Sequence, residues 1–256
     1  MTDLGSLAAR IVDGSIEVID LTSPLHAGTP ILQLPPQWGQ TNTFQLEEIS
    51  RYDDRGPAWY WNNIRTGEHT GTHLDAPNHW VTGKDKEDVA QIPPRNLIGP
   101  AVVIDKVKEA TEDPDYLLDV KDLEEWQAQH GPLPDSGWLL FRTGWSGRGD
   151  DPRRFANADD KGAHTPGMTH AAARYLAASD LLGVGVETVG TDAGQAYGFD
   201  PAFPCHQEVL GAGKYGLTQL RNLDRLPVTG AVVIAAPLPI VTGSGSPARV
   251  LALVEK

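Results

Sequence analysis

The chain has 256 residues, of which 40% are hydrophobic and 21% charged, a composition typical of a globular protein with a sizeable core. Its net charge of −13 opposes binding to nucleic acid and to anionic membranes. The single cysteine, Cys205, excludes an internal disulfide framework, and no run of 18 apolar residues occurs. We therefore expect a cytoplasmic protein that does not enter a membrane.

The predicted elements alternate between buried strands and a few helices. Residues 1–15 are predicted as a leading helical segment, with its helix over 4–13. Further helices are predicted over 119–130, ending before Gly131, and over 169–179, opening with Thr169 as N-cap. Apolar and β-branched runs bounded by Gly and Pro predict buried strands over 16–22, 100–107, 137–143, 181–188, 231–241 and 249–255. This pattern predicts an α/β fold, a single domain over residues 1–256 with a central mixed sheet.

A cluster of residues that commonly bind metal ions lies within the eleven-residue sequence HTGTHLDAPNH: His69, His73, Asp75 and His79. Their even spacing places all four side chains on one face of an extended chain. On a straight strand, however, His69 and His73 would lie about 13 Å apart, too far to bind one ion. We therefore expect the chain to bend at Gly71, which tolerates left-handed backbone, and to turn again at Pro77.

Two imidazoles and one carboxylate suit a divalent cation such as Zn²⁺ or Mn²⁺, with coordination positions left open for water. Such an ion activates water and polarises a carbonyl oxygen, as hydrolysis of an amide, ester or lactone requires. His79, beyond Asp75, is predicted to transfer protons, because an imidazole titrates near neutral pH. The chain has no G-x-S-x-G motif, and the adjacent Cys205 and His206 point to opposite faces of an extended chain, which disfavours a serine or cysteine nucleophile.

The motif HTGTHLDAPNH resembles the signature of the cyclase-type metal-dependent hydrolases, a family that includes bacterial kynurenine formamidase and isatin hydrolase. The resemblance covers nearly the whole chain, through residues 31–36, 68–85, 189–196, 203–206, 222–227 and 243–253. The tryptophan after the last motif histidine, the VTGKD that follows it and the GTDAGQA segment are most similar to the isatin hydrolase branch. The family implies a swivelling α/β fold, a homodimer and a metal-activated water that opens a cyclic amide to a carboxylate.

The resemblance also implies a role for each histidine of the motif. His69, His73 and Asp75 match the metal ligands of the family, His79 matches its acid/base histidine, and His206 matches a second histidine that lines the site and contacts the substrate.

One position departs from the formamidase branch, which usually carries a glutamate twelve residues after that second histidine. Thr218 stands there in this chain, which favours one metal ion over two. The resemblance to isatin hydrolase implies Mn²⁺, with Zn²⁺ as the alternative. Gln219, which stands where an isatin hydrolase carries a serine, is predicted to contact the substrate.

Aromatic residues gather around the motif in the sequence, at positions 38, 59–61 and 80. Indole rings stack well on flat substrates, so we predict that Trp61 and Trp80 bind a small aromatic lactam such as isatin. Two alternatives stay open: an arylformamidase or lactone hydrolase with the same site, and a non-catalytic protein that binds a metal or a metabolite.

Overall fold

The structure, a computed structural model, describes residues 4–35 and 37–256. Its α-helices are α1 (Leu4–Val12), α2 (Val107–Glu112), α3 (Val120–His130), α4 (Pro152–Ala156) and α5 (His170–Ala178). Its longer strands are β1 (Ile16–Asp20), β2 (Gln45–Asp53), β3 (Gly56–Arg65), β5 (Ile98–Asp105), β7 (Trp138–Arg142), β13 (Ala231–Pro237) and β14 (Gly245–Glu255). Its shorter strands are β4 (His73–Asp75), β6 (Leu117–Leu118), β8 (Ala158–Asp159), β9 (Gly162–Ala163), β10 (Gly167–Met168), β11 (Gly183–Val186) and β12 (Tyr215–Thr218).

Seven strands form a closed, mixed β-barrel in the order β14-β13-β5-β7-β11-β12-β4, because β14 also pairs with β4. The strands β5, β7, β11 and β12 run parallel to one another, and the other neighbours are antiparallel. The predicted mixed α/β fold is confirmed, but the sheet is closed. Closure is possible because the long strand β14 pairs with β4 at its beginning, with β13 along its middle and with β1 at its end.

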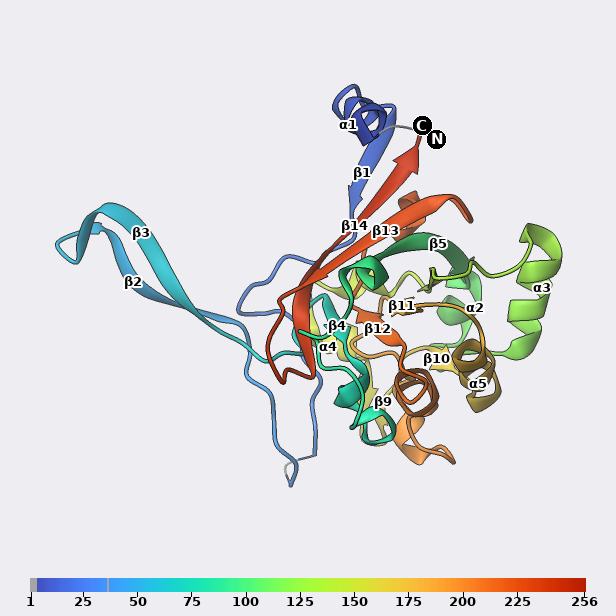
Figure 1. The fold of residues 1–256 in the computed structure, drawn as a ribbon. Helices are drawn as coiled ribbons and strands as arrows, with labels where there is room; N and C mark the ends of the chain where they lie inside the picture. Colours follow the sequence, from blue (N-terminus) through green and yellow to red (C-terminus); the bar gives the residue numbers. More distant parts are fainter. Residues whose placement is uncertain (1–3, 36) are drawn as a thin grey trace.

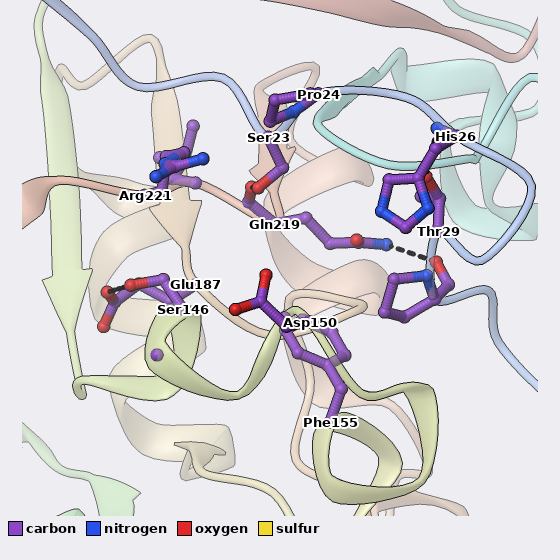
Figure 2. Close-up of a pocket in the computed structure, with 14 residues that line it drawn as sticks. Ser23, Pro24, His26, Thr29, Ser146, Asp150, Phe155, Glu187, Gln219 and Arg221 are labelled. Carbon is purple, nitrogen blue, oxygen red and sulfur yellow. Dashed lines mark hydrogen bonds between the residues drawn. The ribbon is translucent and has the colours of Figure 1, made fainter.

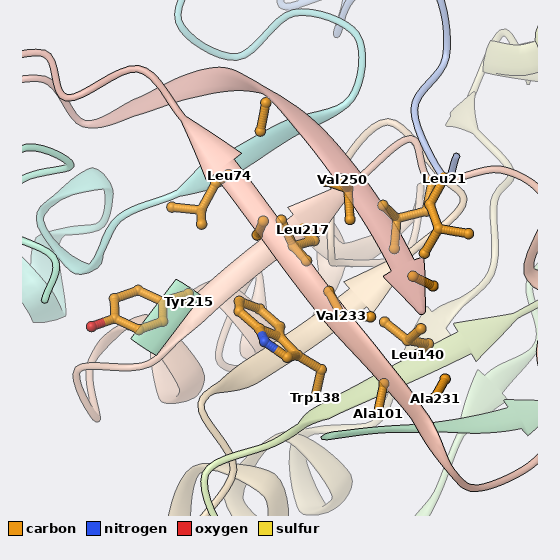
Figure 3. Close-up of a cluster of buried hydrophobic side chains, with 14 of the residues drawn as sticks. Leu21, Leu74, Ala101, Trp138, Leu140, Tyr215, Leu217, Ala231, Val233 and Val250 are labelled. Atoms are coloured by element: carbon orange, nitrogen blue, oxygen red, sulfur yellow. The ribbon is translucent and has the colours of Figure 1, made fainter. Parts of the chain in front are cut away.

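Alternating side chains divide the hydrophobic residues between two cores. In β5, Ala101 and Val103 belong to the cluster inside the barrel, and Val102 and Ile104 belong to the cluster outside it. The inner cluster also contains Leu74, Trp138, Leu140, Tyr215, Leu217, Val233 and Val250 (Figure 3). The outer cluster packs the barrel against α3 and α5, which cover the same side of it (Figure 1).

The strands and helices expected from the sequence are confirmed, with ends shifted by a few residues. Thr169 caps α5, since its hydroxyl accepts a hydrogen bond from the Ala172 amide, and Gly131 ends α3 with a φ of +94°. The helix α1 lies within the predicted leading segment, whose residues 1–3 are outside the described residues. Over the described residues, no helix is both long and apolar enough to cross a membrane.

The hairpin of β2 and β3 was not predicted from the sequence. It extends far from the barrel (Figure 1), and among the described residues its two strands pair only with each other. Its strands expose large apolar side chains: Leu46, Tyr52, Trp59, Tyr60, Trp61 and Ile64. Both faces of the hairpin carry polar and apolar side chains, and neither face packs on the barrel. The sequence of the hairpin therefore lacks the alternation of polar and apolar residues that predicts a strand.

Candidate metal centre and active site

The backbone of the histidine motif bends at the two predicted positions. Gly71 has a φ of +66°, and Pro77 is the first residue of a 3₁₀ turn, η1 (Pro77–His79), which carries His79. Between these bends, β4 is held on one side by β12 and on the other by the beginning of β14. At Gly245 a β-carbon would lie 2.6 Å from the ring of His69, so only glycine lets β14 approach the motif this closely.

The three histidines of the motif gather around the carboxylate of Asp75, which is almost wholly buried. Its Oδ1 lies 2.7 Å from His69 Nδ1 and 3.3 Å from His73 Nε2. The ring of His79 stacks on that of His69, with 3.9 Å between centroids. Among the described residues, His69, Asp75 and His79 offer ligand atoms that all lie within 4.8 Å of one another.

The electrostatics of this cluster favour an ionised carboxylate. Burial alone would raise the pKa of the Asp75 carboxyl, but His73 and His69 beside it hold that pKa well below its usual range. Burial lowers the pKa of the His79 imidazole to about 3, so this ring is neutral at pH 7. An ionised carboxylate among imidazole nitrogens is a donor set that binds a divalent cation.

The tautomer of His73 follows from its neighbours. Its Nδ1 lies 2.7 Å from the carbonyl oxygen of Gly71, a group that only accepts hydrogen bonds, so Nδ1 carries the proton. The other nitrogen, Nε2, is then left with its lone pair on the side of Asp75. Thr218 is fully buried, and its hydroxyl lies 2.8 Å from the same Nδ1. Thr218 therefore contacts this imidazole from the position where the formamidase branch carries a glutamate.

A hydrogen-bonded chain fixes the proton of His69 as well. The Ser244 hydroxyl lies 2.7 Å from a Glu68 carboxylate oxygen and 2.8 Å from His69 Nε2. A hydroxyl has one proton, which it donates to the carboxylate, so it accepts a proton from Nε2. The Ser244 amide donates to the same oxygen of Glu68.

This proton count tests whether the cluster fits a metal ion. In a neutral His69, Nδ1 presents a lone pair to the Asp75 oxygen 2.7 Å away. Two lone pairs at that separation repel each other unless a cation binds both atoms. Neutral imidazole nitrogens around one buried carboxylate are the donor set that Zn²⁺ and Mn²⁺ accept. The residues fit a divalent cation.

A second pair, His206 and Asp192, flanks the cluster. Both carboxylate oxygens of Asp192 are occupied: one accepts the Cys205 amide, and the other accepts the His206 amide and lies 2.5 Å from His206 Nδ1. Burial would lower the pKa of His206, but Asp192 raises it above its ordinary value. Its Nε2 lies 3.9 Å from Asp75 Oδ2, and its ring lies 4.7 Å from that of Trp80.

Two residues that we predicted to bind the substrate lie elsewhere in the protomer. Trp61 is 54% exposed on the projecting hairpin, which carries it away from the metal cluster of its own chain (Figure 1). The Gln219 side chain donates to the Pro30 carbonyl oxygen and lines a separate cavity of about 380 Å³ together with Glu187 and Arg221 (Figure 2). Trp61 is close to the motif in the sequence, but β3 runs away from the barrel, so a contact of Trp61 with the substrate stays a prediction.

The sequence analysis missed the supporting residues of the site. Glu68 and Ser244 were not singled out, although Glu68 directly precedes the first motif histidine. Asp192 follows a predicted strand, where a turn-forming aspartate is common, so its residue type alone does not mark it as part of the site. The partners of these side chains are far away in the sequence, and that pairing cannot be read from spacing.

The Cyclase family model matches residues 19–193. The chain belongs to the Cyclase family. It is 46% identical to the isatin hydrolase of Roseibium aggregatum, over 99% of this chain and 97% of that relative. It is 28% identical to the kynurenine formamidase of Salinibacter ruber, over 91% and 95% of the two chains.

Solved structures of isatin hydrolases are also similar to this chain. An isatin hydrolase bound to the product analogue thioisatinate is 45% identical, with a TM-score of 0.97 over 100% of both chains. Isatin hydrolase A from Ralstonia solanacearum is 52% identical, with a TM-score of 0.96 over 100% of this chain and 98% of that one. The family resemblance drawn from the HTGTHLDAPNH motif is confirmed.

Proposed function

We propose that this chain is a metal-dependent hydrolase that opens isatin, a cyclic aromatic amide, to isatinate. The observation that carries the proposal is the convergence of the His69, His73 and His79 rings on the buried carboxylate of Asp75. Its support beyond the site is the similarity to isatin hydrolases over the full length of the chain.

We propose that His69, His73 and Asp75 hold one divalent ion, with Mn²⁺ favoured and Zn²⁺ as the alternative. When bound, such an ion supplies Lewis acidity, which lowers the pKa of water and polarises a carbonyl oxygen. Thr218 supports a single ion, since its hydroxyl cannot replace the carboxylate that a second ion requires. A ring nitrogen of His79 also lies within 4.8 Å of the ligand atoms of His69 and Asp75, so metal binding by His79 is tested directly.

In the reaction, His79 is assigned the proton transfers. The neutral imidazole takes a proton from the attacking water, whose oxygen bonds to the amide carbon, and burial makes this imidazole a weaker base than the sequence analysis expected. The carbon–nitrogen bond then breaks, and His79 returns the proton to the leaving nitrogen, which becomes an amine. The second proton of the water leaves to solvent from the new carboxylic acid, which becomes the carboxylate. His206, whose pKa Asp192 raises, would donate a hydrogen bond to a substrate oxygen, and the Trp80 ring beside it offers a stacking surface.

Measuring metal binding by variants distinguishes a His79 that transfers protons from a His79 that binds the metal ion. If His79 only moves protons, chelator-stripped His79→Ala still binds one equivalent of Mn²⁺ with nearly normal affinity and loses turnover, whereas His73→Ala loses the metal. A large loss of affinity in His79→Ala with little loss in His73→Ala would instead make His79 a ligand. Full activity in metal-loaded His79→Ala would overturn its role in proton transfer.

An arylformamidase of the same site is the second candidate, favoured by the similarity to kynurenine formamidases. Thr218 argues against it, because the formamidase branch usually carries a glutamate there. A side-by-side assay of isatin, N-formylkynurenine and a dienelactone decides between them. The proposal predicts the highest kcat/KM for isatin, and a higher value for either of the other two would replace it.

We also propose a homodimer. An isolated two-stranded hairpin is marginally stable in water, yet the β2–β3 hairpin exposes aromatic side chains on strands that pair only with each other. The helix α1 likewise buries no residue and exposes Leu4 and Val12. A second copy of the chain would cover these surfaces, and Trp61 would then reach the substrate of that second copy.

Mixed dimers test this arrangement. Trp61→Ala and His79→Ala homodimers are each expected to have low activity. In the heterodimer, the subunit that keeps His79 receives Trp61 from its neighbour, so co-expression restores up to one working site. A monomer by analytical ultracentrifugation, or no restoration in a verified heterodimer, would refute the proposal for Trp61.

A further inference from the structure

Four aromatic rings from three distant segments of the chain form a continuous series that begins at the active site. The Trp80 ring lies 4.7 Å from His206 and 5.4 Å from Phe203. Phe203 lies 6.2 Å from Tyr197, which in turn lies 5.8 Å from Trp38. We call Trp80, Phe203, Tyr197 and Trp38 the aromatic wall.

The aromatic wall runs from the interior of the site to the surface. Trp80 and Phe203 are half-buried, whereas Trp38 is 43% and Tyr197 67% exposed. None of the four belongs to either of the two hydrophobic cores among the described residues. Their ring contacts link them to one another and to His206, so membership of the two cores does not explain them.

Phe203 adopts a backbone conformation that is rare for a bulky side chain, with a φ of +52°. Two hydrogen bonds hold it there: the Phe203 amide donates to the Ala196 carbonyl, and the Gln207 amide donates to the Phe203 carbonyl, both at 3.0 Å. The surrounding loop thus maintains a strained residue whose ring meets Trp80. Strain that is retained in this way is common where a side chain must be aimed at a ligand.

The position of this series indicates its ligand. Rings that meet at tilted or edge-on angles of 60–66° leave ring faces and edges available to another planar group. Aliphatic compounds gain little from such a surface beyond burial, whereas a fused aromatic ring also gains stacking and edge contacts. The wall therefore discriminates by the flatness and aromaticity of the ligand.

We propose that Phe203 and Tyr197 are specificity-determining residues, which select planar aromatic ligands and guide them along the aromatic wall to the histidine cluster. This inference deepens the proposed function, because it concerns the substrate class of the same site. It assigns no chemical step to these residues.

The test measures binding rather than turnover. The dissociation constants of 2-aminobenzoate and of cyclohexanecarboxylate, an aliphatic acid of similar size, are measured by calorimetry on metal-loaded protein. Phe203→Leu and Tyr197→Leu are each expected to weaken 2-aminobenzoate about 2- to 12-fold, the range for losing one aromatic contact, and to change cyclohexanecarboxylate little. Tyr175→Leu, in the groove between α3 and α5, is the matched control and should change neither.

Two further measurements keep the outcome clear. Phe203→Tyr keeps the ring and should bind 2-aminobenzoate like the wild type, which separates loss of the ring from damage to the loop. Equal weakening of both acids, or no weakening of the aromatic one, would overturn the inference. Selective weakening in a protein that does not hydrolyse isatin would support the aromatic wall while refuting the proposed reaction, so the two failures are distinguishable.

Discussion

Replacing Ser244 by alanine removes the link between Glu68 and His69 without changing the size of the side chain appreciably. Two hydrogen bonds are lost, one of 2.8 Å to His69 Nε2 and one of 2.7 Å to Glu68. At about 0.5–1.5 kcal/mol each, the loss is about 1–3 kcal/mol, or about 5- to 150-fold in metal affinity. Outer hydrogen bonds to metal-binding histidines generally contribute about 10- to 100-fold, which agrees with this range.

Isothermal calorimetry with Mn²⁺ and Zn²⁺ on chelator-stripped protein measures this effect directly. Ser246→Ala is the matched control, because the Ser246 hydroxyl is buried nearby but, within the described part of the chain, bonds to the Leu238 amide and the Pro247 carbonyl and not to the histidine cluster. We expect weaker metal binding in Ser244→Ala alone. Wild-type affinity in Ser244→Ala, or the same loss in Ser246→Ala, would refute the proton assignment at His69.

Three further predictions concern the scaffold. Leu140→Ala opens a cavity inside the barrel and should lower the free energy of urea unfolding by about 2–5 kcal/mol; a loss under about 1 kcal/mol would contradict the inner core. Thr169→Ala removes the α5 N-cap and should cost about 1 kcal/mol in the same assay, unlike Thr169→Ser. Hydrogen bonds to Asp115 and Asp159 raise the pKa of His164, so its stabilisation is present below about pH 6.5 and lost as pH rises through the folded pKa. His164→Gln should therefore lower Tm more at about pH 5.5 than at about pH 8.5. An equal loss of Tm at both pH values, or a larger loss at the higher pH, would contradict the stabilising role of protonated His164.

Residue spacing and residue type predicted the features that depend on the local backbone. The distance between His69 and His73 on a straight strand required a bend, and Gly71 provides it. The apolar runs of β5 and β7 predicted strands buried on both faces, and their residues do alternate between the two cores. These features depend on neighbours in the sequence, where spacing and residue type carry the information.

Features that depend on distant pairing could not be predicted. The barrel closes because residues 245–247 pair with β4, and no signal near residue 73 names that partner. Ser244 contacts His69 across 175 positions of sequence. The position of Trp61 could not be predicted for the same reason, since closeness in sequence to the motif says nothing of the direction in which the β2–β3 hairpin leaves the barrel.

The most direct test of the account is the ring opening of isatin, followed by absorbance, on chelator-stripped protein before and after addition of Mn²⁺ or Zn²⁺. We predict no turnover without metal and restored turnover with a divalent ion, with Mn²⁺ the more effective of the two. Full activity after verified removal of the metal would contradict the role assigned to His69, His73 and Asp75. No turnover of isatin with any divalent ion would contradict the proposed function.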